Sequence, residues 1–259
     1  MGNKELYGYV KPAIAVACNL LLSYAVFMLC RIEFMVENWQ CFADDMTVGL
    51  FFSIIRGGLL FDTSAILYTN IIYIALTLFP IHLKDTNAYA AVTKWVYVVT
   101  NTLAVCVSLA DSVVFQHTGQ RTTLALLRMA GGETGIGRTV AGELLSHWYL
   151  VLIAAALAFA MWKLYTAYRT KAYYRLVRYY VWQLLLIVCA APLVVAGMRG
   201  SFDVTEPRLE VADANRYVNK QTETTLVLNT PFMLYRSVDN VPNQDNASVD
   251  AAGSEIKGE

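Results

Sequence analysis

Charged residues are scarce in this sequence. Only 15% of its 259 residues are Asp, Glu, Lys or Arg, whereas soluble domains carry about 25%. Hydrophobic residues make up 57% of the chain, and the mean hydropathy is +0.45. The 20 basic and 20 acidic residues cancel, so no basic excess points to nucleic acid as a partner. A chain of this composition needs an apolar solvent, and a lipid bilayer supplies one.

Motifs for catalysis and for metal binding are also missing. The five cysteines include no CxxC pair, and the three histidines lie far apart, with no HExxH spacing. The glycine-rich stretch 131–137 lacks the Lys-Ser/Thr that follows in a phosphate-binding P-loop. No GxSxG nucleophile elbow occurs. We therefore assign no catalytic residue, no metal ligand and no cofactor to this chain.

Long apolar segments dominate what is present. A helix needs roughly 20 mainly apolar residues to cross a bilayer, and its amides must bond within the helix because lipid offers no partner. Five segments meet this requirement: residues 13–30, 64–81, 95–110, 149–165 and 181–197. The sequence therefore predicts an all-α integral membrane protein with five transmembrane helices.

A sixth apolar run, 48–61, is shorter and contains Arg56 and the pair Gly57-Gly58. We predict a short interfacial or re-entrant helix here, leading into the second span. Alternatively, the run fuses with that span into one long kinked helix. Polar residues within the spans are candidates for hydrogen bonds between helices; they are Asn19, Ser23, Asn70, Thr100 and Asn101.

The chain divides into three parts on this basis. Residues 1–197 form the predicted five-helix transmembrane domain. Residues 198–238 are mixed in character, include a β-prone or buried run at 224–228, and are predicted to be an extracytoplasmic linker. Residues 239–259 are rich in Asn, Asp, Ser, Ala and Gly, a composition that predicts a disordered end.

Basic residues in the short loops predict the orientation, because cytoplasmic loops carry an excess of Lys and Arg. Loop 163–180 contains Lys163, Arg169, Lys171, Arg175 and Arg178 and no acidic residue. This pattern places that loop and the N-terminus in the cytoplasm. Five spans then place the C-terminal tail on the outer side of the membrane.

Five charged residues are predicted to lie at the outer face of the membrane, at or near the ends of spans: Arg31, Arg56, Asp62, Asp111 and Arg121. Ionisable groups at membrane depth are costly and are usually paired or functional. An arginine binds a lipid phosphate through its planar fork. We therefore predict a lipid-headgroup site in which the two carboxylates hold the arginines in place. The alternative is that these charges only anchor helix ends and form simple ion pairs.

Three stretches follow one another in an informative order. The first is 58–65 (GLLFDTSA), followed by Tyr68 and Asn70. The second is 111–115 (DSVVF), followed by Thr118 and by 121–123 (RTT). The third comprises 199–200 (RG), 214–217 (ANRY) and 226–232 (LVLNTPF). In order and spacing they resemble the membrane portion of the lipoteichoic acid synthase-like family, and most of all its Bacteroides-like members. These are phosphoglycerol transferases and sulfatases of the alkaline phosphatase superfamily.

The resemblance implies a protein of a bacterial inner membrane with five spans, a periplasmic C-terminus and a large extracytoplasmic catalytic domain. That domain would carry a threonine nucleophile and a divalent metal such as manganese, and would transfer glycerol phosphate from phosphatidylglycerol or hydrolyse a related ester. A metal suits this chemistry because it neutralises phosphate charge and lowers the pKa of the nucleophile. The catalytic domain should begin soon after 229–232, and no candidate residues for it follow in this sequence.

We therefore predict the membrane-anchoring module of such a transferase or sulfatase, truncated or split before its catalytic domain. Its expected partners are membrane lipids, including anionic headgroups, and a separate catalytic subunit. The alternative is a non-catalytic polytopic membrane protein that binds a partner through loop 111–147 and the tail 198–236.

Overall fold

The computed structural model describes residues 3–79, 86–131, 142, 146–168, 176–203 and 205–239. Within these ranges every regular element is a helix, and none of the described residues forms a strand. The predicted all-α class is therefore confirmed for this part of the chain. His82, residues 132–137 of the glycine-rich stretch and the predicted disordered end after Asp239 lie outside the described residues.

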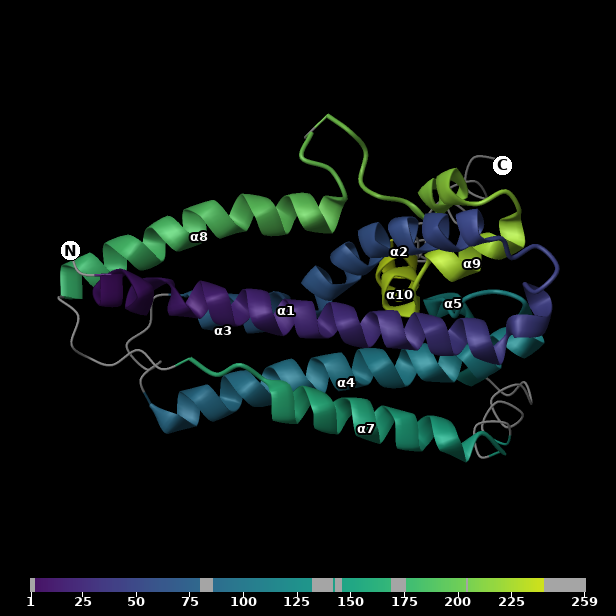
Figure 1. Cartoon of the computed structure of the whole chain (residues 1–259), viewed down its shortest axis with the longest axis horizontal. Coiled ribbons are helices and arrows are strands. Elements are labelled where there is room, and N and C mark those ends of the chain that lie inside the picture. The colour runs from purple at the N-terminus through teal and green to yellow at the C-terminus, as the bar shows by residue number, and fades with distance from the viewer. Residues whose placement is uncertain are drawn as a thin grey trace, which may run out of the picture.

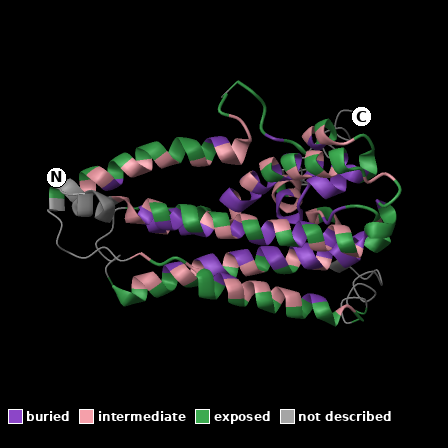
Figure 2. Ribbon diagram, in the orientation of Figure 1, coloured by how far each residue is buried: buried purple, intermediate pink, exposed green. Residues whose placement is uncertain are grey.

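Two long helices form the centre of the molecule. Helices α1 (Asn3–Glu37) and α4 (Asn87–Thr118) run side by side along its whole length (Figure 1). Helix α7 (Trp148–Leu164) packs against α4 on one side, and α8 (Leu176–Arg199) lies on the other side, against α2 (Val48–Thr69). Buried residues concentrate where α1, α2 and α4 face one another (Figure 2).

Helix α2 is continuous from Val48 to Thr69. Thr47 caps its start, because the Thr47 hydroxyl oxygen accepts a hydrogen bond from the Leu50 amide at 3.2 Å. The helix ends at Asn70, and α3 (Ile71–Leu78) follows directly. Residues 48–61 are thus not a separate short helix. As in the alternative, they fuse with the start of the second predicted span, but that span is broken at Asn70 and does not form one kinked helix.

Among the described residues, four helices are long and apolar enough to cross a membrane by length and composition: Val10–Glu37, Val48–Thr69, Asn87–Thr118 and Tyr180–Arg199. Helix α7 is also apolar but has 17 residues. These helices support the prediction that the chain is a membrane protein. Because α1 and α4 extend beyond their predicted ends, Arg31 and Asp111 lie within helices rather than in loops.

The interior of the bundle contains a polar network between helices. Asn70, at the break between α2 and α3, and Asn101 of α4 donate through their side-chain amides to each other's oxygens at 3.1 and 2.7 Å. Ser23 of α1 donates to the Asn101 oxygen at 3.0 Å, and Asn19 donates to the Tyr73 hydroxyl at 2.6 Å. All of these side chains are fully buried. The predicted interhelical bonds are therefore present, except that Thr100 bonds within its own helix.

The C-terminal segment folds back onto one end of this bundle. It contains η3 (Val211–Tyr217), η4 (Gln221–Glu223), α9 (Thr224–Val227) and α10 (Thr230–Asp239). Together with η1 (Trp39–Cys41) and α5 (Leu124–Gly131), these elements cover the end where α1 and α4 finish and α2 begins (Figure 1). We call this the linker end. The run 224–228 is buried, as predicted, but forms a helical turn rather than a strand.

Candidate functional site

Arg31 and Asp62 form a buried ion pair between α1 and α2. The Arg31 Nη2 atom lies 2.5 Å from Asp62 Oδ1, and Arg31 is only 6% exposed. The other terminal nitrogen, Nη1, donates to the main-chain oxygens of Leu226 and, at 2.7 Å, Val227. The guanidinium lies across Gly58, where a Cβ atom would come within 2.6 Å of Arg31 Cζ. A glycine is therefore required for this close approach.

Arg121 and Asp111 form a second buried pair nearby. Arg121 Nη1 donates to Asp111 Oδ2 at 2.9 Å, and Arg121 Nε donates to the main-chain oxygen of Thr225 at 2.9 Å. Arg121 Cζ also stacks 3.4 Å from the centre of the Phe34 ring, a cation–π contact. Burial lowers the pKa of Arg121, and the neighbouring Asp111 carboxylate opposes that effect. The guanidinium stays charged because its ordinary pKa is above about 12.

Asp111 is saturated with hydrogen bonds. Its Oδ1 atom accepts from the Thr122 amide at 2.7 Å and from the Thr122 hydroxyl. Its Oδ2 atom accepts from the Thr230 hydroxyl at 2.8 Å, in addition to Arg121. Four donors therefore surround this buried carboxylate, two on each oxygen. Asp111 thereby joins α4, the turn after α4 and the start of α10.

Asn229 connects the first ion pair to α10. Its side-chain nitrogen donates to Asp62 Oδ1 at 2.7 Å, while its side-chain oxygen accepts from the Phe232 amide at 2.8 Å and caps the first turn of α10. Farther along α10, the Phe232 ring packs edge-on against Phe61, with 5.0 Å between the ring centres. The Tyr235 hydroxyl lies 2.8 Å from that of Thr69. The start and the direction of α10 are therefore both fixed by α2.

We call Arg31, Asp62, Asp111 and Arg121, with the main-chain oxygens of residues 225–227, the linker clasp. Its two positive and two negative charges balance, as burial requires. The two guanidiniums satisfy three consecutive main-chain oxygens of a buried segment, which would otherwise lack partners. In the described ranges, no group of three or more His, Cys, Asp or Glu residues is arranged to hold a metal ion. What this arrangement does is bind the main chain of residues 225–227.

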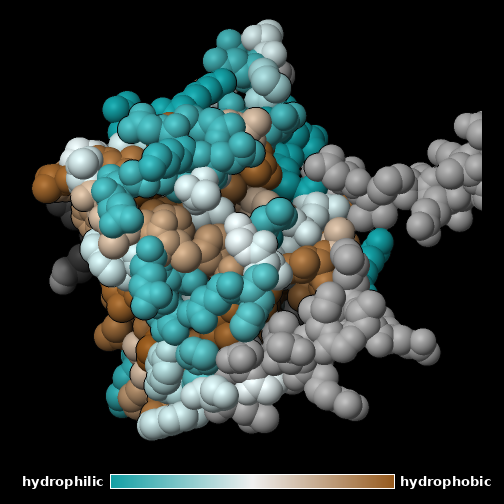
Figure 3. All heavy atoms as spheres, turned by 90° about the vertical axis from the view of Figure 1, so that its right-hand side faces the viewer, coloured by the Kyte–Doolittle hydropathy of each residue, from teal (hydrophilic) through white to brown (hydrophobic). Residues whose placement is uncertain are grey.

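The structure brings together four of the five predicted site residues. Asp62 and Asp111 each hold one arginine, as the sequence predicted. Arg56 does not join them: it lies exposed on α2. The four clasp residues face protein partners beneath the surface of the linker end, which is largely hydrophilic with apolar patches (Figure 3). Binding of a lipid headgroup by the five residues stays a prediction.

Sequence reasoning missed the residues of the linker that the clasp holds. Leu226 and Val227 contribute main-chain oxygens, so their side chains give no signal. Asn229 and Thr230 had a signal, because an Asn followed by Pro in the next few positions is typical of a helix start. All three stretches that carry the family resemblance contribute here: Asp62 from the first, Asp111 and Arg121 from the second, and 226–230 from the third.

A comparison of the chain with known protein families, curated proteins and solved structures gave no match. Membership of the lipoteichoic acid synthase-like family therefore stays a prediction that rests on these three stretches.

Proposed function

We propose that this chain is a membrane-anchoring module that fixes the position and direction of an extramembrane protein unit at its linker end. The observation that carries this proposal is the clasp: two buried arginines bind three consecutive main-chain oxygens of the linker. A linker that served only as a tether would need no such contacts. A unit that continues from α10, or binds to it, is held at a fixed place on the bundle.

Five membrane crossings fit this proposal. Along the chain, α1, α2 with α3, α4, α7 and α8 alternate in direction, so α8 runs away from the end where the N-terminus lies and toward the linker end (Figure 1). In this arrangement the apolar α7 makes the fourth crossing. The basic residues of 163–180 favour a cytoplasmic N-terminus. The linker end then faces the periplasm of a bacterial inner membrane.

The resemblance suggests what the extramembrane unit is. In the lipoteichoic acid synthase-like family it would be a metal-dependent phosphoglycerol transferase or sulfatase domain, located either farther along the polypeptide or on a separate subunit. The stretches that carry this resemblance also provide three of the four charged clasp residues, Asp62, Asp111 and Arg121, which supports an anchoring role. The nucleophile and the manganese would belong to that unit, and no catalytic step is assigned to the residues of this chain.

Purification from native membranes tests the proposal. A photoreactive residue replaces Val238, which is exposed on α10, and a matched one replaces Val177, which is exposed on α8 near the opposite end. We expect either an intact mass well above 28.9 kDa or a second polypeptide that crosslinks at position 238 and not at position 177. The crosslink should weaken when Arg31 and Arg121 are both alanine.

Three outcomes separate the candidates. A larger mass, or a crosslinked subunit with transferase or sulfatase activity, supports the proposal that the chain anchors such a catalytic unit. A crosslinked partner without that activity supports the non-catalytic, partner-binding alternative. A mass of 28.9 kDa with no crosslink at position 238 contradicts both.

A further inference from the structure

One face of α1 is apolar and exposed along most of the helix. Five large exposed side chains lie on this face, within about 80° of one another around the axis: Ile14, Leu21, Leu29, Ile32 and Val36. At 1.5 Å per residue, the distance from the first to the last is about 33 Å, close to the roughly 30 Å of bilayer hydrocarbon. The exposed Trp39 follows directly, and tryptophan is enriched at membrane surfaces. The length of this face and the residue at its end both fit lipid as its solvent.

Helices α4 and α7 reach the same level as the end of this face. Hydrogen bonds between α1 and α4 join residues that are 78 or 79 positions apart, so the two helices run in parallel with a nearly constant offset. The outward face of α4 is apolar as far as Val114, which this offset places level with Val36. Helix α7 begins at that level too, because the Tyr149 hydroxyl donates to the Glu37 carboxylate at 2.7 Å. The neighbouring Trp148 is 64% exposed.

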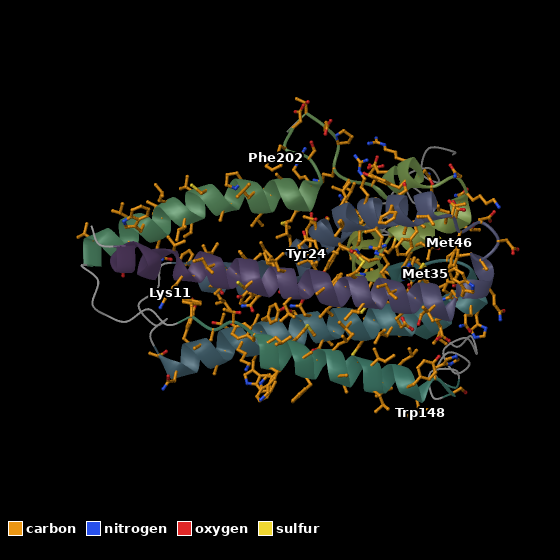
Figure 4. The ribbon with its side chains drawn as sticks, viewed as in Figure 1. Lys11, Tyr24, Met35, Met46, Trp148 and Phe202 are labelled. Carbon is orange, nitrogen blue, oxygen red and sulfur yellow. The ribbon has the colours of Figure 1, made fainter. Side chains whose placement is uncertain are left out.

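The other side of the bundle is polar near its linker end. Helix α8 stops beside Ser64 of α2, whose hydroxyl donates to a main-chain oxygen in the last turn of α8 at 2.8 Å. At 1.5 Å per residue, this contact is about 24 Å from the start of α2. The loop that follows α8 carries exposed charged residues: Asp203, Glu206 and Arg208. Figure 4 shows Phe202 of this loop and Trp148 of α7 on opposite sides of the bundle.

We infer that the bundle lies tilted in the bilayer, so that the α1–α4–α7 side of the linker end is embedded in lipid while the side with η3 faces water. Membrane helices tilt by up to about 40°, which accommodates α7 and α8 at their different heights (Figure 1). The partner of the embedded side is the acyl chains of the leaflet on the linker side. The inference does not rest on the proposed anchoring role, because it concerns where the membrane ends and not what the linker carries.

The linker clasp then lies below the membrane surface on the embedded side. Arg31 precedes Val36 by about 7.5 Å along α1, and Asp111 precedes Val114 by about 4.5 Å along α4. At membrane depth a main-chain oxygen must find its partner within the protein, because lipid offers none. The last oxygens of a helix such as α9 have no partner within that helix. The two clasp arginines satisfy them, which explains why charged side chains hold residues 225–227 at this level.

Spin-label accessibility of the full chain in phosphatidylcholine–phosphatidylglycerol vesicles tests the inference. The five native cysteines are replaced, and one label at a time is placed at Ile32 of α1 or at Val211 of η3. These two apolar side chains are matched, because they are 40% and 36% exposed. Power saturation compares collisions with oxygen, which concentrates in lipid, and with a nickel chelate, which stays in water. Labels at the exposed Leu21 and Gln40 calibrate the bilayer interior and the water beyond α1.

We expect oxygen to dominate at Ile32, as at Leu21, and the nickel chelate to dominate at Val211, as at Gln40. A second label at Val151 of α7, which is 61% exposed, should behave like the one at Ile32. Dominance of the nickel chelate at Ile32 and Val151 would overturn the inference, because the clasp would then stand outside the membrane. Low collision rates with both reagents there would also overturn it, since protein and not lipid would cover these faces. Dominance of oxygen at Val211 would contradict the tilt. Each of these contrary results would leave open to separate test whether the clasp fixes the linker.

Discussion

Replacing Arg121 with alanine should release the linker from the bundle while leaving the helices in place. The change removes the hydrogen bonds to Asp111 and Thr225 and the stacking on Phe34. It also leaves the Asp111 carboxylate buried without its counter-charge, although Thr122 and Thr230 still donate to it.

The expected size of the effect follows from the burial of the pair. Removing one partner of a buried ion pair costs about 3–5 kcal/mol, because the remaining charge is uncompensated. A free-energy change of this size shifts an equilibrium by about 10²- to 10⁴-fold, since each factor of ten corresponds to about 1.4 kcal/mol. The equilibrium constant for detachment of α9 and α10 from the bundle should rise by that factor.

Hydrogen–deuterium exchange of the protein in lipid nanodiscs measures this opening. Amides of 224–239 should exchange about 10²- to 10⁴-fold faster in Arg121→Ala, whereas those of α1 and α4 should change little. Arg56→Ala is the matched control, because Arg56 is exposed and surface changes usually stay within about 0.5 kcal/mol. Exchange in 224–239 that is unchanged in Arg121→Ala, or equally fast in Arg56→Ala, would refute the reasoning.

Three further predictions concern packing, the polar network and the orientation. Gly57→Ala should destabilise the linker by about 1–3 kcal/mol, because its Cβ atom would lie 2.5 Å from the Tyr217 ring; faster proteolysis of 205–239 than in Gly49→Ala, which meets nothing within 4 Å, checks this. Asn101→Ala should lower the unfolding free energy in detergent by about 1–2 kcal/mol, and an unchanged value would contradict a role in joining helices. Exposed Cys41 should react with a membrane-impermeant maleimide from the periplasmic side; labelling only after the cells are lysed would reverse the proposed orientation.

The helices were predictable from the sequence, but the extent of α2 was not. Apolar length identified most of the bundle, because lipid leaves helices as the main solution for the backbone. The features that argued against a membrane-spanning helix at 48–61 were its shortness, Arg56 and the Gly57-Gly58 pair. In the structure both glycines instead admit partners, Tyr217 and Arg31, against the helix backbone. That reason is tertiary and is invisible in a single segment.

The charged residues of the clasp were predictable as a group, and their roles were predictable only in part. Asp62 and Arg56 are six residues apart, which places them roughly 120° apart around an α-helix. Once 48–69 is known to be one helix, Arg56 is therefore expected to face away from the pair. The partners of the arginines were beyond prediction, because main-chain oxygens of apolar residues such as Leu226 leave no mark in the sequence.

The central claim is that the bundle holds the linker in one position, and a distance measurement in the membrane tests it most directly. Spin labels at Val36 of α1 and Val238 of α10, both exposed, are introduced into a chain whose five native cysteines are replaced. Double electron–electron resonance then gives the distribution of distances between them. We predict one narrow distribution that broadens when Arg31 and Arg121 are both replaced by alanine. A broad distribution in the unaltered linker, or a narrow one that survives both replacements, would contradict the account.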